Sequence, residues 1–318
     1  MRTPSRARVI RLGVAAAATA LLATTLTATP SEATTTRPFA PSSPFNVPIK
    51  TSPQLDPASA AMVARAARDR QVYANLYAYG IPIYGSTSTT PRYSIACAME
   101  GAWGHCPLSD RPMPIPTHAK PSTGTDGAMV VIEPAGSIGE YWQAARTSTG
   151  WTASWGAINS LTGSGWGGAS TGAGASRLGG VIRVSEIQAG LIDHALVVQS
   201  DTVCAGVFRA PAIKTDGDST RADCLPEGAR LQLDPSIDVS RIAGITPAER
   251  TVARALQRYG AYVIDRGGAP LSMSFERAPD ATASSPGSTY KAAGLSWDYY
   301  GMPRIPWSRL RVLKTWQG

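Results

Sequence analysis

The stretch from Ala128 to Ile158, AMVVIEPAGSIGEYWQAARTSTGWTASWGAI, decides the fold. Residues 128–132 form a short apolar run, and residues 138–145 and 151–158 alternate between apolar and other side chains. Such alternation is typical of strands that bury one face. Proline and glycine lie in the gaps, where turns are expected. The stretch therefore predicts three short strands in succession.

The same pattern continues along the chain. Many short strands separated by turns are typical of sandwiches and barrels. We therefore predict a mainly β protein with peripheral helices, a jelly-roll-like β-sandwich, folded as one domain over residues 45–318. The further strands are expected at residues 203–210, 229–233, 261–265, 271–275 and 310–313.

Three segments have helical patterns. Residues 56–79 begin with Asp56 as a capping residue and carry an imperfect apolar stripe. Residues 185–192 open with Ser-x-x-Gln, which predicts a capping box. Residues 246–260 begin with Thr246 and proline and carry a glutamate three residues after the cap, so a third helix is expected there.

The first 33 residues have the pattern of a secretory signal peptide. Four arginines precede the apolar run Leu12–Leu26, and small residues flank a cleavage site after Ala33. The run is too short and too rich in alanine for a membrane span. We expect export by the general secretory route, cleavage near Ala33, and a flexible leader over residues 34–44, which are rich in Thr, Ser and Pro.

The charge balance argues against a nucleic-acid partner. The chain has 30 basic and 22 acidic residues and a formal net charge of +8. Four of the basic residues belong to the expected signal peptide, and no later run of Lys or Arg occurs. Neither nucleic acid nor, after signal cleavage, a membrane is expected as a partner.

Four cysteines agree with export, because disulfides persist in oxidising compartments. Cys97, Cys106, Cys204 and Cys224 allow three pairings, of which Cys97–Cys106 with Cys204–Cys224 is the simplest, since each pair brackets a loop rich in turn residues. A zinc site is the competing interpretation, but no Cys-x-x-Cys occurs.

Several phrases of the sequence carry a family resemblance: SPFNVPI (43–49), GGVIRVSEIQAGLIDHAL (179–196), EGARLQLDPSIDV (227–239) and ARALQRYGAYVIDRGG (253–268). In them the chain resembles a family of exported proteins of soil actinobacteria that has no assigned activity. The resemblance implies one secreted domain and carries over no catalytic role. A histidine is expected in this family near residues 126–129, where this chain has none.

The most suggestive chemical group is Glu140. On a strand it shares a face with Trp142, and a carboxylate beside an indole in apolar surroundings has a raised pKa. A glycosidase makes its general acid in this way. Alternatively, Trp142 belongs to the core and Glu140 makes a structural contact at a sheet edge.

A second group of catalytic candidates surrounds the short helix. His194 can act as an acid or base near neutral pH, and Asp193 precedes it. Glu186 lies in the first turn of the helix. Each has a structural alternative: His194 can link the helix to the next strand, and Glu186 gains from the helix dipole.

Trp151, Trp155 and Trp166 are interleaved with glycine and serine. Exposed indoles stack against the apolar face of sugar rings, so these residues, with Trp142, are candidates for substrate binding. Trp151 and Trp155 would share a face of one strand, and the Gly/Ser-rich loop 162–176 could lie over a cleft. Equally, the tryptophans could fill a core that is poor in phenylalanine.

No motif predicts a metal or a cofactor. Asp216-Gly217-Asp218, with Asp223 nearby, lacks the spacing of a calcium loop, and we interpret it as a polar turn. The sequence therefore favours a secreted carbohydrate-active enzyme, a glycoside hydrolase or polysaccharide lyase, acting on an extracellular polysaccharide. The alternative is a non-catalytic protein that binds a glycan or the cell wall through the same tryptophans.

Overall fold

The structure, a computed structural model, describes Met1 and residues 37–168 and 170–315. The chain divides into two units after Thr34, and everything below concerns the second, which is a single domain. The expected signal peptide lies outside the described residues. Within the described ranges, no helix has both the length and the apolar character that a membrane crossing requires.

The larger sheet has six strands and mixes parallel with antiparallel neighbours. In spatial order they are β1 (Tyr73–Asn75), β16 (Ser272–Ser274), β11 (Leu196–Ser200), β15 (Ala261–Arg266), β14 (Arg230–Leu233) and β17 (Leu310–Val312). β1 runs parallel to β16 and β11 runs parallel to β15, whereas the other neighbours are antiparallel.

The smaller sheet has four strands, three of which come from the stretch that opens this section. In spatial order they are β10 (Trp155–Ser160), β7 (Ser137–Trp142), β6 (Met129–Ile132) and β2 (Ile83–Gly85). β7 lies in the middle, where Glu140 pairs with Ala157 on one side and with Val130 on the other. Position 140 therefore lies on an interior strand, paired on both sides, and not at a sheet edge.

The two sheets face each other across a shared core. Val130 and Ile138 of the smaller sheet belong to the same buried cluster as Val197, Tyr262 and Ile264 of the larger one. Alternation along each strand sends the intervening residues to separate cores on the outer faces. The mainly β, sandwich-like single domain is confirmed. The parallel pairs depart from the all-antiparallel order of a jelly roll.

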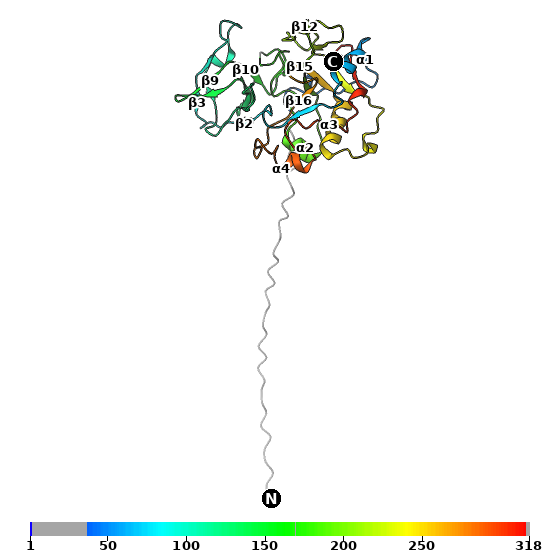
Figure 1. Ribbon diagram of the computed structural model, residues 1–318. Helices are drawn as coiled ribbons and strands as arrows, with labels where there is room; N and C mark the ends of the chain where they lie inside the picture. Colours follow the sequence, from blue (N-terminus) through cyan, green and yellow to red (C-terminus); the bar gives the residue numbers. More distant parts are fainter. Residues whose placement is uncertain (2–36, 169, 316–318) are drawn as a thin grey trace. The chain divides into compact units, whose positions relative to one another are not determined.

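Helices cover the outer face of the larger sheet, where Met62, Ile187, Val252 and Tyr290 join its core. They are α1 (Ser59–Ala66), α2 (Val184–Ala189), α3 (Pro247–Arg258) and α4 (Ser288–Ala292), with short 3-10 turns at Pro107–Ser109, Val239–Arg241 and Trp307–Arg309. The small strands β3 and β9 lie at the opposite end of the unit from α1 and α3 (Figure 1).

Three smaller sheets complete the domain. They are β4 (Ile95–Cys97), β9 (Trp151–Ala153) and β8 (Ala145–Arg146); β3 (Arg92–Tyr93) and β5 (Met113–Pro114); and β12 (Val203–Phe208) and β13 (Leu225–Glu227). The expected disulfides, Cys97–Cys106 and Cys204–Cys224, are both confirmed. They indicate an oxidising environment.

Of the helix expected over residues 56–79, only Ser59–Ala66 is helical, and Ala58 takes the N-cap position predicted for Asp56. Arg70 has a φ of 55°, which ends the helical path, and the chain then enters β1. Val72 and Leu76 are buried, as the apolar stripe predicted, but on extended backbone. Residues 151–158 likewise form two strands in different sheets, with a break at Ser154.

The other two helices are present, with one correction. α3 has the predicted capping box: Glu249 N–H donates to Thr246 Oγ1, and Thr246 N–H donates to Glu249 Oε2. At α2, Ser185 and Gln188 do not form the expected box. Glu186 instead accepts a hydrogen bond from the N–H of Arg183 at 2.8 Å, so the helix begins earlier than predicted.

Residues 37–44 are packed into the domain, so the expected flexible leader is wrong for them. Phe39 is buried with its ring 5.6 Å from that of Phe45. The Asn46 side chain donates to the carbonyls of Pro38 and Ala40, both at 3.0 Å. The Ser/Pro composition predicted mobility, but one buried phenylalanine and one amide hold the segment in place. Residues 34–36 lie outside the described ranges.

Candidate functional site

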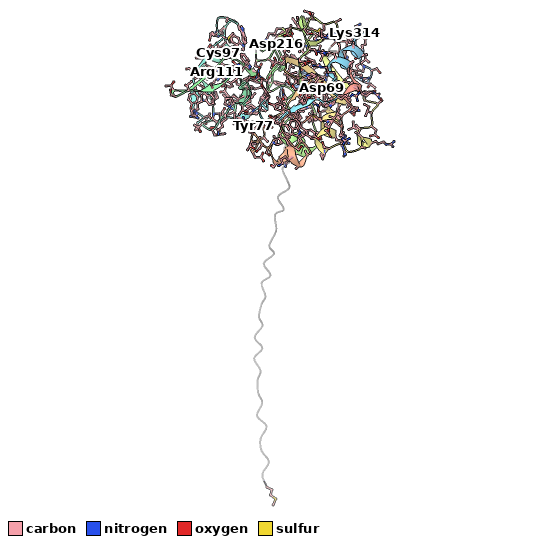
Figure 2. All side chains as sticks on the ribbon, viewed as in Figure 1. Asp69, Tyr77, Cys97, Arg111, Asp216 and Lys314 are labelled. Atoms are coloured by element: carbon pink, nitrogen blue, oxygen red, sulfur yellow. A yellow bond between two sulfur atoms is a disulfide. The ribbon has the colours of Figure 1, made fainter. Side chains whose placement is uncertain are left out.

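A cleft with a volume of about 1650 Å³ opens where the larger sheet extends beyond the smaller one. Tyr73, Gln199, Ser272 and Ile264 line it from the face of the larger sheet that turns toward the smaller sheet. Part of this face is covered by the shared core, and the remainder, with polar side chains on β1, β11 and β16, lines the cleft. Asp69 and Asp216, which also line it, are labelled in Figure 2.

One wall of the cleft is aromatic. The rings of Trp103 and Trp142 stack with centroids 5.5 Å apart, and the Trp155 ring meets Trp103 edge-on at 5.7 Å. Trp155 is 7% exposed and forms the buried part of the cluster, whereas Trp103 is 53% exposed to solvent. The three indoles form a continuous apolar surface, of which Trp103 is the most exposed part.

Trp103 is a site residue that the sequence analysis missed. It lies in the loop that the Cys97–Cys106 disulfide closes. A loop of nine residues encloses no core of its own, so a tryptophan among its glycines has little to bury it. That position, between two nearby cysteines, is the signal by which Trp103 could have been found.

Trp166 lines the cleft from the Gly/Ser-rich loop, as predicted. It is half-buried, stacks on Phe45 at 5.2 Å and meets Tyr262 edge-on at 5.3 Å. Trp151 does not line the cleft. It is 4% exposed in the core beneath the smaller sheet, because β9 and β10 are separate strands and do not share a face. The expected sugar contact of Trp151 is therefore corrected to a core role.

Glu140 lies directly behind the cleft wall. It has no exposed surface and accepts hydrogen bonds from Asn159 Nδ2 at 2.9 Å and from the hydroxyls of Ser170 and Ser176. Burial raises the pKa of Glu140, and these donors oppose that shift. The predicted raised pKa is present, but hydroxyl and amide groups surround the carboxyl in place of the expected indole.

The other three catalytic candidates lie elsewhere. His194 Nε2 is 2.9 Å from Glu186 Oε1, and both residues are buried. Burial lowers the pKa of His194, but the hydrogen bond and charge of Glu186 outweigh it and hold the pKa above its ordinary value. Asp193 pairs with Arg37 at 3.3 Å. None of the three lines the cleft, so the structure separates them from Glu140.

A cluster of carboxyl groups forms part of the polar wall. Oxygens of Asp216, Glu227 and Asp265 all lie within 4.8 Å of one another. Asp216 and Asp265 line the cleft, and Glu227 is buried behind them at the end of β13. Burial, reinforced by the charge of Asp216, raises the pKa of Asp265 and brings that of Glu227 to about 8.

The sequence analysis named Asp216 only as part of a polar turn and did not consider Glu227 or Asp265. The three come from a loop and from two strands that belong to different sheets, so no local spacing could have grouped them. Positive groups share the same wall: Arg177, Lys214 and Arg266 line the cleft, and the Arg177 guanidinium donates to the carbonyl of Ser170. The cleft thus combines an aromatic surface with charges of both signs.

Asp126 lies on the cleft near the end of the aromatic wall. It is half-buried and lines the cleft, and its backbone carbonyl accepts a hydrogen bond from the N–H of Gln143 at 2.6 Å. That bond holds the Asp126 backbone beside the end of β7, where Trp142 precedes Gln143. No protein-family model, curated protein or solved structure matches this chain, and the geometry of the cleft carries the functional inference.

Proposed function

We propose that the protein is a secreted carbohydrate-active enzyme that cleaves an extracellular polysaccharide bound in this cleft. The observation that carries the proposal is the pairing of an indole wall with a polar wall across one open cleft. A pyranose ring needs both surfaces, because its C–H face is apolar while its hydroxyl groups require hydrogen-bonding partners. The two disulfides support the extracellular location.

The size of the cleft favours a polymer. Sites for a single small molecule measure about 300–1000 Å³, and this cleft, at about 1650 Å³, exceeds that range. Its lining extends from Trp103 at one end of the aromatic wall to Asp69 and Tyr73 of the β1 region. Several sugar units of one chain can therefore occupy it together.

Cleavage requires a group that transfers a proton at the glycosidic bond. We assign this role to Asp126, because it lines the cleft and its backbone is paired with Gln143, the residue that follows Trp142 of the aromatic wall. In hydrolysis, the protonated carboxyl group would donate its proton to the departing sugar oxygen, water would add to the sugar carbon, and the proton that this water loses would restore the carboxyl group. In a lyase reaction, the carboxylate would take the proton next to the uronate carboxyl group, the bond to the departing sugar oxygen would break with formation of a C=C double bond, and the departing oxygen would take up the proton.

Glycan binding without cleavage is the second candidate, and one observation favours it. Glu140 is fully hydrogen-bonded behind the wall, while Glu186, Asp193 and His194 lie outside the cleft. A protein that only binds glycans would need the indole wall and none of these groups. The two candidates share the same surface and differ in whether products form.

The test of cleavage is an incubation of the purified protein with a panel of soluble polysaccharides. Reducing ends without ultraviolet absorbance identify a hydrolase, and absorbance from unsaturated uronates identifies a lyase. Asp126→Asn should lower the rate at least about a hundredfold, as expected for a proton-transfer group. A wild-type rate in this variant would exclude Asp126, and binding without products would favour the non-catalytic protein.

The test of binding uses two tryptophans of matched exposure. Trp103 is 53% exposed and lines the cleft, whereas Trp297 is 52% exposed and is not part of its lining. Trp103→Ala should weaken binding of the polysaccharide that the wild type binds about tenfold, because stacking of one ring on an aromatic side chain contributes about 1–3 kcal/mol. Trp297→Ala should leave the binding unchanged. Equal effects of the two substitutions would contradict a sugar-binding role for the aromatic wall.

A further inference from the structure

We propose that Asp216, Glu227 and Asp265 bind one calcium ion at the edge of the cleft. Each residue offers a carboxylate oxygen, and these oxygens lie within 4.8 Å of one another. Calcium binds oxygen ligands at about 2.3–2.6 Å, so two ligands of one ion lie at most about 5 Å apart. A single ion can therefore contact all three residues without a change in the backbone.

A buried, unpartnered oxygen points to a ligand independently of that spacing. Glu227 has no exposed surface, and its Oε1 has no hydrogen-bond partner among the described residues. Its other oxygen, Oε2, accepts from the N–H of Asp216 at 3.2 Å. A buried carboxylate oxygen without a partner is costly, and a cation would remove that cost.

The oxygen of Glu227 points toward the same place as that of Asp216. A Cβ atom added to Gly172 would lie 2.6 Å from Glu227 Oε1 and 2.5 Å from Asp216 Oδ1. The two oxygens therefore converge beside Gly172, whose own N–H donates to Asp265 Oδ1 at 3.0 Å. Glycine at position 172 leaves open a space that any side chain would fill.

No basic side chain forms an ion pair with the cluster within the described part of the chain. None of the ion pairs there includes Asp216, Glu227 or Asp265. The positive charge of Arg177 acts on Asp265, but its guanidinium donates to the carbonyl of Ser170. Arg266 directs its guanidinium to Asp218 at 2.8 Å, and only its backbone N–H reaches Asp216 Oδ1. Three acidic groups that share one small volume repel each other, so the binding of a divalent cation would be strongly favoured.

The space beside Gly172 provides a test that leaves all the charges in place. The chelator-treated protein is titrated with CaCl₂ by calorimetry, and melting curves are recorded with and without the ion. We expect one calcium ion per chain and a higher melting temperature with calcium. Gly172→Ala should weaken calcium binding at least tenfold, whereas Gly268→Ala, also in the cleft lining but with open space around it, should not.

Removing a ligand provides the second test. Asp216→Asn alters the exposed ligand, so the variant should fold and lose at least tenfold in calcium affinity. Asp223→Asn changes a half-buried carboxylate of the same loop that pairs with Arg221, and should bind calcium as the wild type does. The assignment would be overturned if millimolar calcium gave neither a heat of binding nor a shift in melting temperature. It would also be overturned if Asp216→Asn bound calcium as tightly as the wild type, or if the wild type bound Mg²⁺ as tightly as Ca²⁺.

Discussion

At the scale of single residues, the tryptophans of this chain divide into two kinds, buried and exposed, that residue type alone does not distinguish. Trp151 and Trp103 both follow glycine or alanine in polar surroundings. The first is buried among Met129, Tyr141 and their neighbours, and the second lies open on the cleft. Which surface an indole meets depends on strand pairing far away in the sequence, so residue type alone left the two alternatives equal.

Truncation separates the two kinds. Trp151→Ala should remove a filled volume from the core and lower the free energy of unfolding by about 3–5 kcal/mol. Trp103→Ala should change it by less than about 1 kcal/mol, because the side chain is largely in solvent. Denaturant unfolding of both variants measures the difference. Similar losses in the two would show that Trp103 also supports the fold.

Glu140 should behave as a structural residue. Its carboxyl group accepts from one amide and two hydroxyls inside the domain. In Glu140→Gln the new NH₂ group would face donors, so we expect a loss of about 1–3 kcal/mol in unfolding free energy. Chemical denaturation checks this. A Gln variant with wild-type stability and a hundredfold lower rate would instead return Glu140 to a catalytic role.

The His194–Glu186 pair should make stability depend on pH. The pKa of His194 is raised in the folded protein above its ordinary value of 6.5. The contribution of the pair is therefore fully present below pH 6.5 and is lost as the pH rises through the folded pKa. We expect the unfolding free energy to fall across that interval in the wild type.

His194→Gln provides the comparison, because it removes the titrating group and leaves a side chain that can still donate to Glu186. Its unfolding free energy, measured at a series of pH values from 5 upward, should lack the decline seen in the wild type over the same interval. If both proteins decline in parallel, the pH dependence arises from other groups.

At the scale of elements, prediction succeeded where the signals are local. α3 carries its cap, its proline and its buried stripe within twelve residues, and the structure has it as expected. The segment 56–79 begins with similar signals, yet its residues 73–75 become β1, because pairing with β16 stabilises them as a strand. That partner lies at residues 272–274, so no local pattern could announce it.

In the candidate site, too, local signals are predictive and distant pairings are not. The Gly/Ser-rich composition of loop 162–176 predicts that it lies over a cleft, and Trp166, Ser170 and Gly172 do line one. The carboxyl cluster could not be anticipated, since its members are brought together only when β13 and β15 take their places. Sequence identified residues suited to sugar binding, and the fold determined which of them share a surface.

The loop that carries Trp103 should depend on its disulfide. Replacing both Cys97 and Cys106 by serine removes the covalent closure, so the indole wall should loosen and glycan binding should weaken at least about threefold. The cost in unfolding free energy should be about 2–4 kcal/mol. Replacement of Cys204 and Cys224, which opens the loop that carries Lys214 and Asp216 on the polar wall, is the comparison and should leave the aromatic wall intact. The near-ultraviolet circular dichroism of the stacked indoles should therefore change only in the first variant, and equal changes in the two would contradict a local effect.

At the scale of the whole domain, the cleft is a product of unequal sheets. The larger sheet has six strands and the smaller has four, so the smaller covers only part of the facing surface. The covered part is apolar, with Val197 and Tyr262, and the uncovered part carries Gln199, Ser272 and Ser274. The loop 162–176 and the aromatic wall then border this exposed polar strip.

The order of strands in the larger sheet also governs when the domain can form. Tyr73 pairs with Ser272, and Leu231 pairs with Val312. Because the ribosome makes the chain from its N-terminus, β1 is synthesised long before β16, the strand with which it pairs. Non-local pairing of this kind slows the search for the native state. The larger sheet can therefore be completed only after β16 and β17 are available, whereas the smaller sheet, whose strands lie within residues 83–160, can form earlier.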